Sequence, residues 1–113
     1  MLERFKVPED DQIRIDHKDL RNTVEAIFLK MGCSQEHATA GADTLVSTDL
    51  RGVETHGVSN MLRAYVSEFQ SGKLNCNPEV KVIRETPGTV SLDGDRGLGV
   101  ILAPGAMKRA IDK

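Results

Sequence analysis

One histidine stands beside a glycine in the stretch DLRGVETHGVSNMLRAYVSEF, which runs from Asp49 to Phe69. His56 can give or take a proton near neutral pH. Asn60 and Arg63 follow it at the spacing of about one and two helical turns. Arginine can hold a carboxylate through a forked pair of hydrogen bonds, and asparagine can donate to a carbonyl or hydroxyl. These residue types therefore predict a site for a small hydroxy or oxo acid.

The helix expected to carry this site begins at Thr55, a good N-cap residue, and ends at Gly72. On a helical wheel Arg63 falls close to His56, whereas Tyr65 lies on the opposite side. That opposite face is apolar and predicts burial of Val58, Met61, Leu62, Tyr65, Val66 and Phe69. The helix is therefore divided into a core face and a polar face.

Two other interpretations of the histidine have to be weighed. Most polar helix faces simply meet water, so the polar residues need not form a site. A bound metal is disfavoured because His17, His37 and His56 fall in separate elements without ligand spacing. Gly57 adds to the functional interpretation, because it would let a substrate or another backbone approach closely.

Two helices are expected before this one, from Asp16 to Gly32 and from Ser34 to Gly52, each with a capping residue and a glycine stop. Helical spacing predicts a core formed by Leu20, Val24, Ile27, Phe28, Met31, Ala38, Ala42, Leu45 and Val46. The small residues of the second helix favour close helix packing. Ile13 to Ile15 suggests a short strand.

After the third helix the apolar period changes to that of strands. Glu79 to Glu85 and Thr89 to Asp93 predict a hairpin, joined by a type II turn over Thr86 to Thr89. A last helix is expected from Ala103 to Lys113, with Pro104 in its first turn. The chain is therefore predicted to be α+β, with a three-helix unit, a hairpin and the start of a further helix.

The glycine-rich segment GDRGLG before this helix does not predict a dinucleotide site. A Rossmann fingerprint needs a third glycine, but that position is Leu102, and no βαβ unit surrounds the segment. A tight turn before a helix is the simpler interpretation.

Composition excludes several classes of protein. The chain has 113 residues, 39% of them hydrophobic, and a formal net charge of −2. Scattered basic residues argue against a nucleic-acid or membrane surface. Cys33 and Cys76 form no C-x-x-C motif and predict two reduced thiols. The first residues lack an apolar leader, so a cytoplasmic location is expected.

The expected organisation is an arm at 1–15, the three-helix unit at 16–75, and the hairpin, glycine loop and a truncated helix at 76–113. Ala106, Met107, Ala110 and Ile111 form half of an apolar stripe on a helix without a capping residue. The sequence therefore suggests a fragment of a longer chain. The uncovered stripe predicts a homodimer or higher oligomer.

The segment around His56 resembles the malate/L-lactate dehydrogenase family, the type-2 group that also includes ureidoglycolate dehydrogenase and diketogulonate reductase. The residues that fit the family pattern are Asp49, Arg51, Gly52, Thr55, His56, Gly57, Val58, Gly72 and Pro78. The resemblance runs from about Asp16 to the end of the chain. It implies the first part of a dehydrogenase fold unlike the Rossmann fold.

The resemblance also implies roles. His56 becomes a candidate proton donor or acceptor, with Thr55, Gly57, Asn60 and Arg63 as candidate substrate-binding residues. The family usually has arginine where Asn60 stands, so either Arg63 takes over carboxylate binding or the substrate differs. The expected substrate is a 2-hydroxy or 2-oxo acid of malate or lactate type, and the cofactor is NAD or NADP. The cofactor-binding domain, and a second histidine that some family members use, would lie beyond Lys113.

Two alternatives stay open at this point. The chain could be a small helical interaction module, although the helix that would read DNA carries Arg63 as its single Lys or Arg. It could also be an inactive fragment that folds and self-associates.

Overall fold

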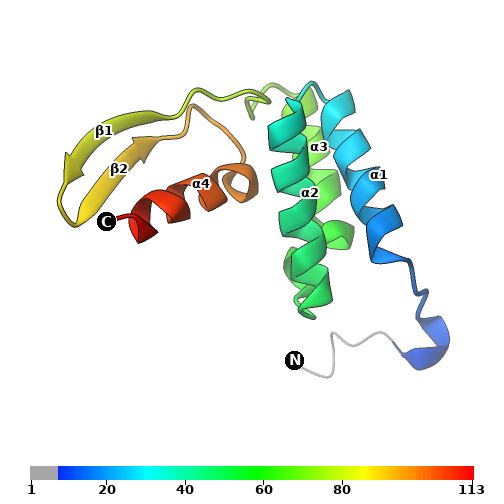
Figure 1. The fold of residues 1–113 in the computed structure, drawn as a ribbon. Helices are drawn as coiled ribbons and strands as arrows, with labels where there is room; N and C mark the ends of the chain where they lie inside the picture. Colours follow the sequence, from blue (N-terminus) through cyan, green and yellow to red (C-terminus); the bar gives the residue numbers. More distant parts are fainter. Residues whose placement is uncertain (1–7) are drawn as a thin grey trace.

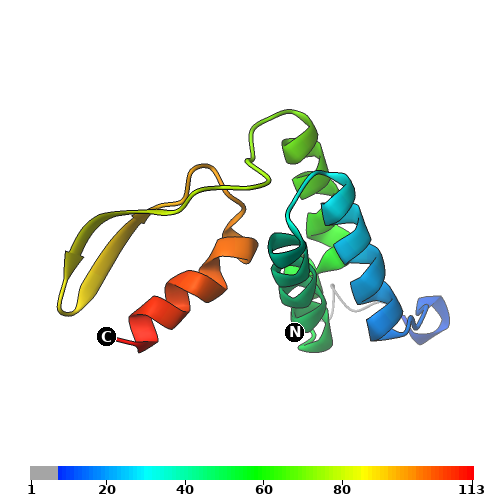
Figure 2. The ribbon, with the colours of Figure 1, turned by 45° about the horizontal axis from the view of Figure 1, so that its top comes forward.

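The computed structural model describes residues 8–113, which form four α-helices and one antiparallel hairpin (Figure 1). The elements are η2 (Glu9–Asp11), α1 (His17–Lys30), α2 (Gln35–Leu50), η3 (Glu54–His56), α3 (Val58–Gln70), β1 (Lys81–Thr86), β2 (Thr89–Asp93) and α4 (Gly99–Ile111). The α+β class is confirmed. Helices α1, α2 and α3 stand side by side, and the hairpin with α4 extends away from them (Figures 1 and 2).

The first two helices begin and end where local signals predict. The Asp16 side chain accepts a hydrogen bond from the backbone N–H of Lys18 at 2.8 Å, and Ser34 Oγ accepts from His37 N at 3.2 Å. Gly32 has a φ of +96°, which glycine adopts without strain after a helix. These caps are local in sequence, which is why the sequence reveals them.

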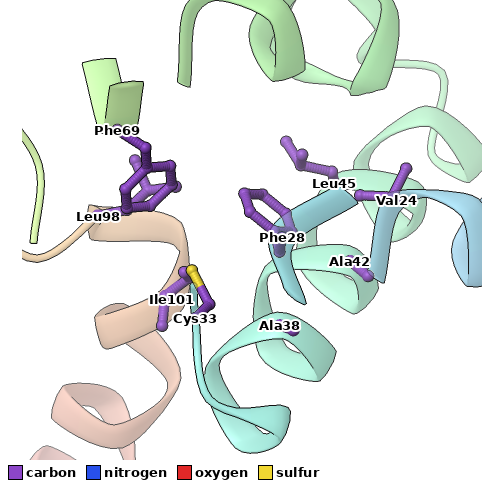
Figure 3. Close-up of a cluster of buried hydrophobic side chains, with 9 residues drawn as sticks. All are labelled: Val24, Phe28, Cys33, Ala38, Ala42, Leu45, Phe69, Leu98 and Ile101. Carbon is purple, nitrogen blue, oxygen red and sulfur yellow. The ribbon is translucent and has the colours of Figure 1, made fainter. Parts of the chain in front are cut away.

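The core lies where the three helices meet α4 (Figure 3). Phe28 is fully buried, and its ring meets that of Phe69 edge to face with centroids 6.2 Å apart. A Cβ on Gly41 would lie 2.8 Å from Phe28 Cε2, so the small residues of α2 let the helices approach closely, as expected. The buried hydrophobic cluster comprises Val24, Phe28, Cys33, Ala38, Ala42, Leu45, Phe69, Leu98 and Ile101.

Two predictions about β-structure are wrong. Gly88 does not have the positive φ that a type II turn requires. Instead, the Thr86 hydroxyl accepts a hydrogen bond from Thr89 N at 3.1 Å and supports a different turn. Ile13 to Ile15 forms no strand, because no strand among residues 8–113 lies beside it, and Ile13 is 86% exposed. Residues 1–7 of the predicted arm lie outside the described residues.

Helix α4 begins at Gly99, so the prediction of a start at Ala103 is wrong. Pro104 lies inside the helix and has no N–H to donate to the carbonyl of Val100. The Thr44 hydroxyl of α2 lies 3.0 Å from that carbonyl and 2.8 Å from the Ala40 carbonyl of its own helix, so the two oxygens share its single proton. A neighbouring helix therefore replaces part of the hydrogen bond that the proline removes.

Thr44→Val should lower the free energy of unfolding by about 1–3 kcal/mol, because the Val100 carbonyl would lose its donor. Urea denaturation followed by circular dichroism would measure it. Thr48→Val is the matched control, since among residues 8–113 the Thr48 hydroxyl bonds only to the Thr44 carbonyl of its own helix. Equal losses in the two variants would contradict the role assigned to Thr44.

An asparagine-rich junction connects the three helices to the hairpin. Asn77 accepts from Ser34 N through Oδ1 and donates to the Gly32 carbonyl through Nδ2, both at 2.8 Å. Asn75 Nδ2 donates to Asp95 Oδ2 at 2.8 Å. The boundary expected between residues 75 and 76 falls inside this junction, and the division into 16–75 and 76–113 stays a prediction.

Candidate functional site

His56 belongs to the short turn η3 and not to helix α3. Gly57 follows in an extended conformation, with φ −91° and ψ −165°, and α3 begins at Val58. The predicted helix start at Thr55 is therefore wrong, and a helical wheel drawn from His56 does not describe the site. Asn60, Arg63 and Ser67 are exposed at helical spacing on α3, and the histidine turn lies before the start of that helix.

The start of α3 is capped by a side chain from the end of α2. Gly57 has no side chain to cap the helix, and Asp49 Oδ2 accepts from Val58 N at 2.9 Å. A Cβ on Gly57 would lie 1.5 Å from Asp49 Oδ1. Gly57 therefore makes room for the Asp49 carboxylate, which occupies the space expected for a substrate or backbone. A glycine just before a helix has no side chain to cap it, so another residue has to supply the cap.

Asn60 binds the first residue of the turn η3. Its Nδ2 donates to the carbonyl of Glu54 at 2.8 Å, and Gly57 N donates to the same oxygen at 3.2 Å. One side-chain N–H of this predicted substrate ligand is thus engaged within the protein. The turn η3 is fixed to α3 through this carbonyl.

His56 and Thr55 contact each other on the exposed surface of the turn. Thr55 Oγ1 lies 2.9 Å from His56 Nδ1. When the threonine hydroxyl donates to Nδ1, the neutral imidazole carries its proton on Nε2. The arrangement leaves Nε2 to exchange a proton with a molecule bound above the turn.

Arg63 lies on the exposed side of α3 and, among residues 8–113, forms no ion pair. Its guanidinium is thus available to a carboxylate. Tyr65 is half-buried and packs against the core, as expected. Burial, and then the charge of Glu68, raises the pKa of the Tyr65 hydroxyl. Tyr65 therefore serves packing and does not face the histidine turn.

Two cavities of the described residues lie away from the histidine turn. One of about 570 Å³ is enclosed by α2, the hairpin and α4, and His37 lines it. A smaller one of about 300 Å³ lies along α2 and reaches Arg51. Neither contains Thr55, His56 or Arg63. The histidine turn therefore lines neither of these two cavities, and its Thr55 and His56 are exposed.

Side chains from two other segments pack against Gly97 in the glycine loop. A Cβ on Gly97 would lie 2.5 Å from Pro78 Cγ and 2.8 Å from Leu102 Cδ1, so protein atoms fill this space. Asp95 and Arg96 have positive φ values of 47° and 58° and form the turn itself. The space beside Gly97 is therefore taken by the protein itself and is not open to a ligand. No cluster of three or more His, Cys, Asp or Glu side chains suited to a metal occurs in residues 8–113. Over the same range, none of the helices combines the length and apolar character needed to span a bilayer.

Cys33, which lies between α1 and α2 next to the asparagine-rich junction, has a thiol with a raised pKa. Burial, and to a smaller extent the neighbouring Cys76 thiol, raises the pKa of Cys33 from 9.0 to about 12. The folded protein thus keeps a proton that the unfolded chain loses above pH 9. We expect this stabilising effect to be complete below about pH 9 and to be lost as the pH rises towards about 12.

Urea denaturation at stepped alkaline pH would measure this loss, with Cys33→Ala as the comparison. The variant should lose less stability than the parent between pH 9 and 12. Identical pH profiles for the two proteins would contradict the assignment to Cys33.

Comparison with known proteins identifies the family. The model of the malate/L-lactate dehydrogenase family matches residues 15–113. Malate dehydrogenase of Pyrococcus abyssi is 42% identical over 113 residues, which are 100% of this chain and 31% of that protein. Hydroxycarboxylate dehydrogenase B of Escherichia coli K12 is 35% identical over 100 residues, or 88% of this chain and 27% of that protein.

Solved structures have the same fold. Malate dehydrogenase from Pyrococcus horikoshii OT3 superposes with a TM-score of 0.87 at 41% identity, covering 99% of this chain and 32% of that one. Sulfolactate dehydrogenase from Methanocaldococcus jannaschii gives 0.83 at 30% identity, covering 88% and 29%. The chain thus spans about a third of the length of these relatives. Sequence and fold together show that the chain belongs to the malate/L-lactate dehydrogenase family.

Proposed function

We propose that this chain is the N-terminal, substrate-side part of an oxidoreductase that transfers a hydride between NAD or NADP and a small 2-hydroxy or 2-oxo acid. The observation that carries the proposal is the exposed histidine turn on a chain that belongs to a family of dehydrogenases. The relatives are named as malate, sulfolactate and hydroxycarboxylate dehydrogenases, all of which act on hydroxy acids by their names.

In this proposal His56 holds the proton that the substrate hydroxyl loses or the carbonyl oxygen gains. Thr55 orients the imidazole through Nδ1, so that Nε2 faces the substrate. Hydride transfer alone would leave an alkoxide, and a proton donor within hydrogen-bonding reach removes that charge. This is the chemistry that an exposed and oriented histidine can supply.

Arg63 is the proposed carboxylate ligand. It is exposed on α3 and unpaired among residues 8–113, whereas Asn60 already donates to the Glu54 carbonyl. A carboxylate held by Arg63, further along α3, would set the orientation of the acid relative to His56. Gly57 contributes indirectly, because it leaves room for the Asp49 carboxylate that caps α3.

The nicotinamide cofactor is proposed to bind residues outside this chain, because the glycine loop lacks the third glycine of a Rossmann fingerprint. Which of NAD and NADP is used would be set there. The same proposal includes a cytoplasmic location and a homodimer or higher oligomer, for which the exposed Met107 and Ile111 of α4 offer apolar surface.

The test is an activity assay on the full-length protein that contains this chain. Malate, lactate and sulfolactate would each be offered with NAD and with NADP, and reduced nicotinamide would be followed by absorbance. Succinate, which lacks the 2-hydroxyl group, is the control and should give no turnover. The proposal would be wrong if none of the hydroxy acids were oxidised with either cofactor.

A further inference from the structure

We propose that Asp49 and Asn60 are positioning residues that hold His56 in place from the two sides of its turn. This inference rests on the proposed function, because it assigns them their effect on the reaction through His56. Neither side chain needs to touch the reacting atoms. Each contacts backbone next to the Thr55 and His56 pair.

The turn cannot hold its own geometry firmly. It is a single 3-10 turn with two backbone hydrogen bonds, from His56 N to the Val53 carbonyl at 3.0 Å and from Gly57 N to the Glu54 carbonyl at 3.2 Å. Short 3-10 turns have poor hydrogen-bond geometry, and both Thr55 and His56 are exposed. Packing therefore contributes little to fixing the imidazole, and the turn depends on contacts from its flanks.

Asp49 fixes the chain just after the histidine. Its carboxylate accepts from Val58 N at 2.9 Å and fills the space above Gly57, which is buried. Asp49 itself is anchored by the end of α2, where Gly52 N donates to its carbonyl at 2.8 Å. A carboxylate at a helix N-terminus makes a charge-assisted bond and interacts favourably with the helix dipole. The end of helix α2 therefore positions Gly57 and Val58, the two residues that follow His56.

Asn60 fixes the chain just before the pair. Its Nδ2 donates to the Glu54 carbonyl at 2.8 Å, from the first turn of α3. The same oxygen accepts from Gly57 N, so one carbonyl connects both ends of the turn to the helix. Thr55 and His56 therefore lie between two fixed backbone groups, the Glu54 carbonyl held by Asn60 and the Val58 N–H held by Asp49.

In this arrangement Asn60 positions the histidine turn and is not a ligand of the substrate. A ligand for the substrate acts mainly on KM, whereas a positioning residue acts mainly on kcat when the imidazole is misplaced. A displacement of about 1 Å in a reacting group can reduce the rate about 100-fold. The ratio of the two kinetic effects therefore separates the two roles.

The experiment compares Asp49→Ala, Asp49→Asn and Asn60→Asp in the full-length protein, alongside His56→Ala. We expect Asp49→Ala to lower kcat about 10- to 100-fold with KM nearly unchanged. Asp49→Asn keeps an acceptor of the same shape and should recover most of the loss. Asn60→Asp has the same size but no donor, and should again lower kcat more than it raises KM.

Ser34→Ala is the matched control, because it removes a helix cap of the same kind at the start of α2. Its unfolding midpoint should fall about as much as that of Asp49→Ala, while kcat stays at the parent value. If His56→Ala is slow but Asp49→Ala behaves like Ser34→Ala, the positioning role is overturned and the proposed function stands. If His56→Ala is as fast as the parent, both the role of His56 and the positioning of it are overturned.

Discussion

Replacing Phe28 with alanine is expected to lower the free energy of unfolding by about 3–5 kcal/mol. Phe28 is fully buried, lies against Phe69 edge to face, and fills the space that Gly41 leaves open. Removal of the ring loses its burial and leaves a cavity between α1, α2 and α3. Since small domains are stable by only about 5–15 kcal/mol, this loss would bring the chain close to unfolding.

Urea denaturation followed by circular dichroism would measure the effect, with Leu29→Ala as the control. Leu29 is the next residue of α1 but is 39% exposed, so its truncation should lower the free energy of unfolding by about 1 kcal/mol or less. If the two variants lost equal stability, the core would not be organised around Phe28. Figure 3 shows Phe28 beside Leu45 and Val24 in the buried cluster.

His56→Ala in the full-length protein is expected to lower kcat by about 100- to 10,000-fold, the range that a positioned general acid or base contributes. Stability should change little, because His56 is exposed and the hydrogen bond from Thr55 is made at the surface. Oxidation of a 2-hydroxy acid, measured by formation of reduced nicotinamide, would give kcat and KM.

His17→Ala is the control for this variant, because His17 is also exposed but lies at the start of α1. It should leave kcat at the parent value. Turnover of His56→Ala at the parent rate would assign the proton to another residue, such as a histidine outside this chain. A fall limited to KM would instead make His56 a ligand of the substrate.

Much of the fold follows from the sequence because the signals are local. Asp16 and Ser34 cap the helices that follow them, and Gly32 stops the helix before it. The apolar spacing of α1 and α2 identifies the residues that are buried, including Phe28 and Leu45. Helix periodicity and helix caps depend on residues only a few positions apart, so the sequence alone predicts where these helices lie.

The sequence also selects the residues of the candidate site but not their arrangement. Types such as His56 and Arg63 can be chosen because their chemistry is intrinsic to the side chain. Their relative directions depend on where α3 begins. That start lies at Val58 and not Thr55, because a carboxylate from the end of α2 caps it.

Tertiary contacts decided the remaining features. The start of α4 at Gly99 is compatible with Pro104 because Thr44, on another helix, bonds the free carbonyl. The partner of Asn60 is a backbone oxygen in the preceding turn, which no periodicity indicates. In each case a polar group that has no hydrogen-bond partner nearby in the sequence finds one on another element. Only the tertiary structure determines which residue becomes that partner.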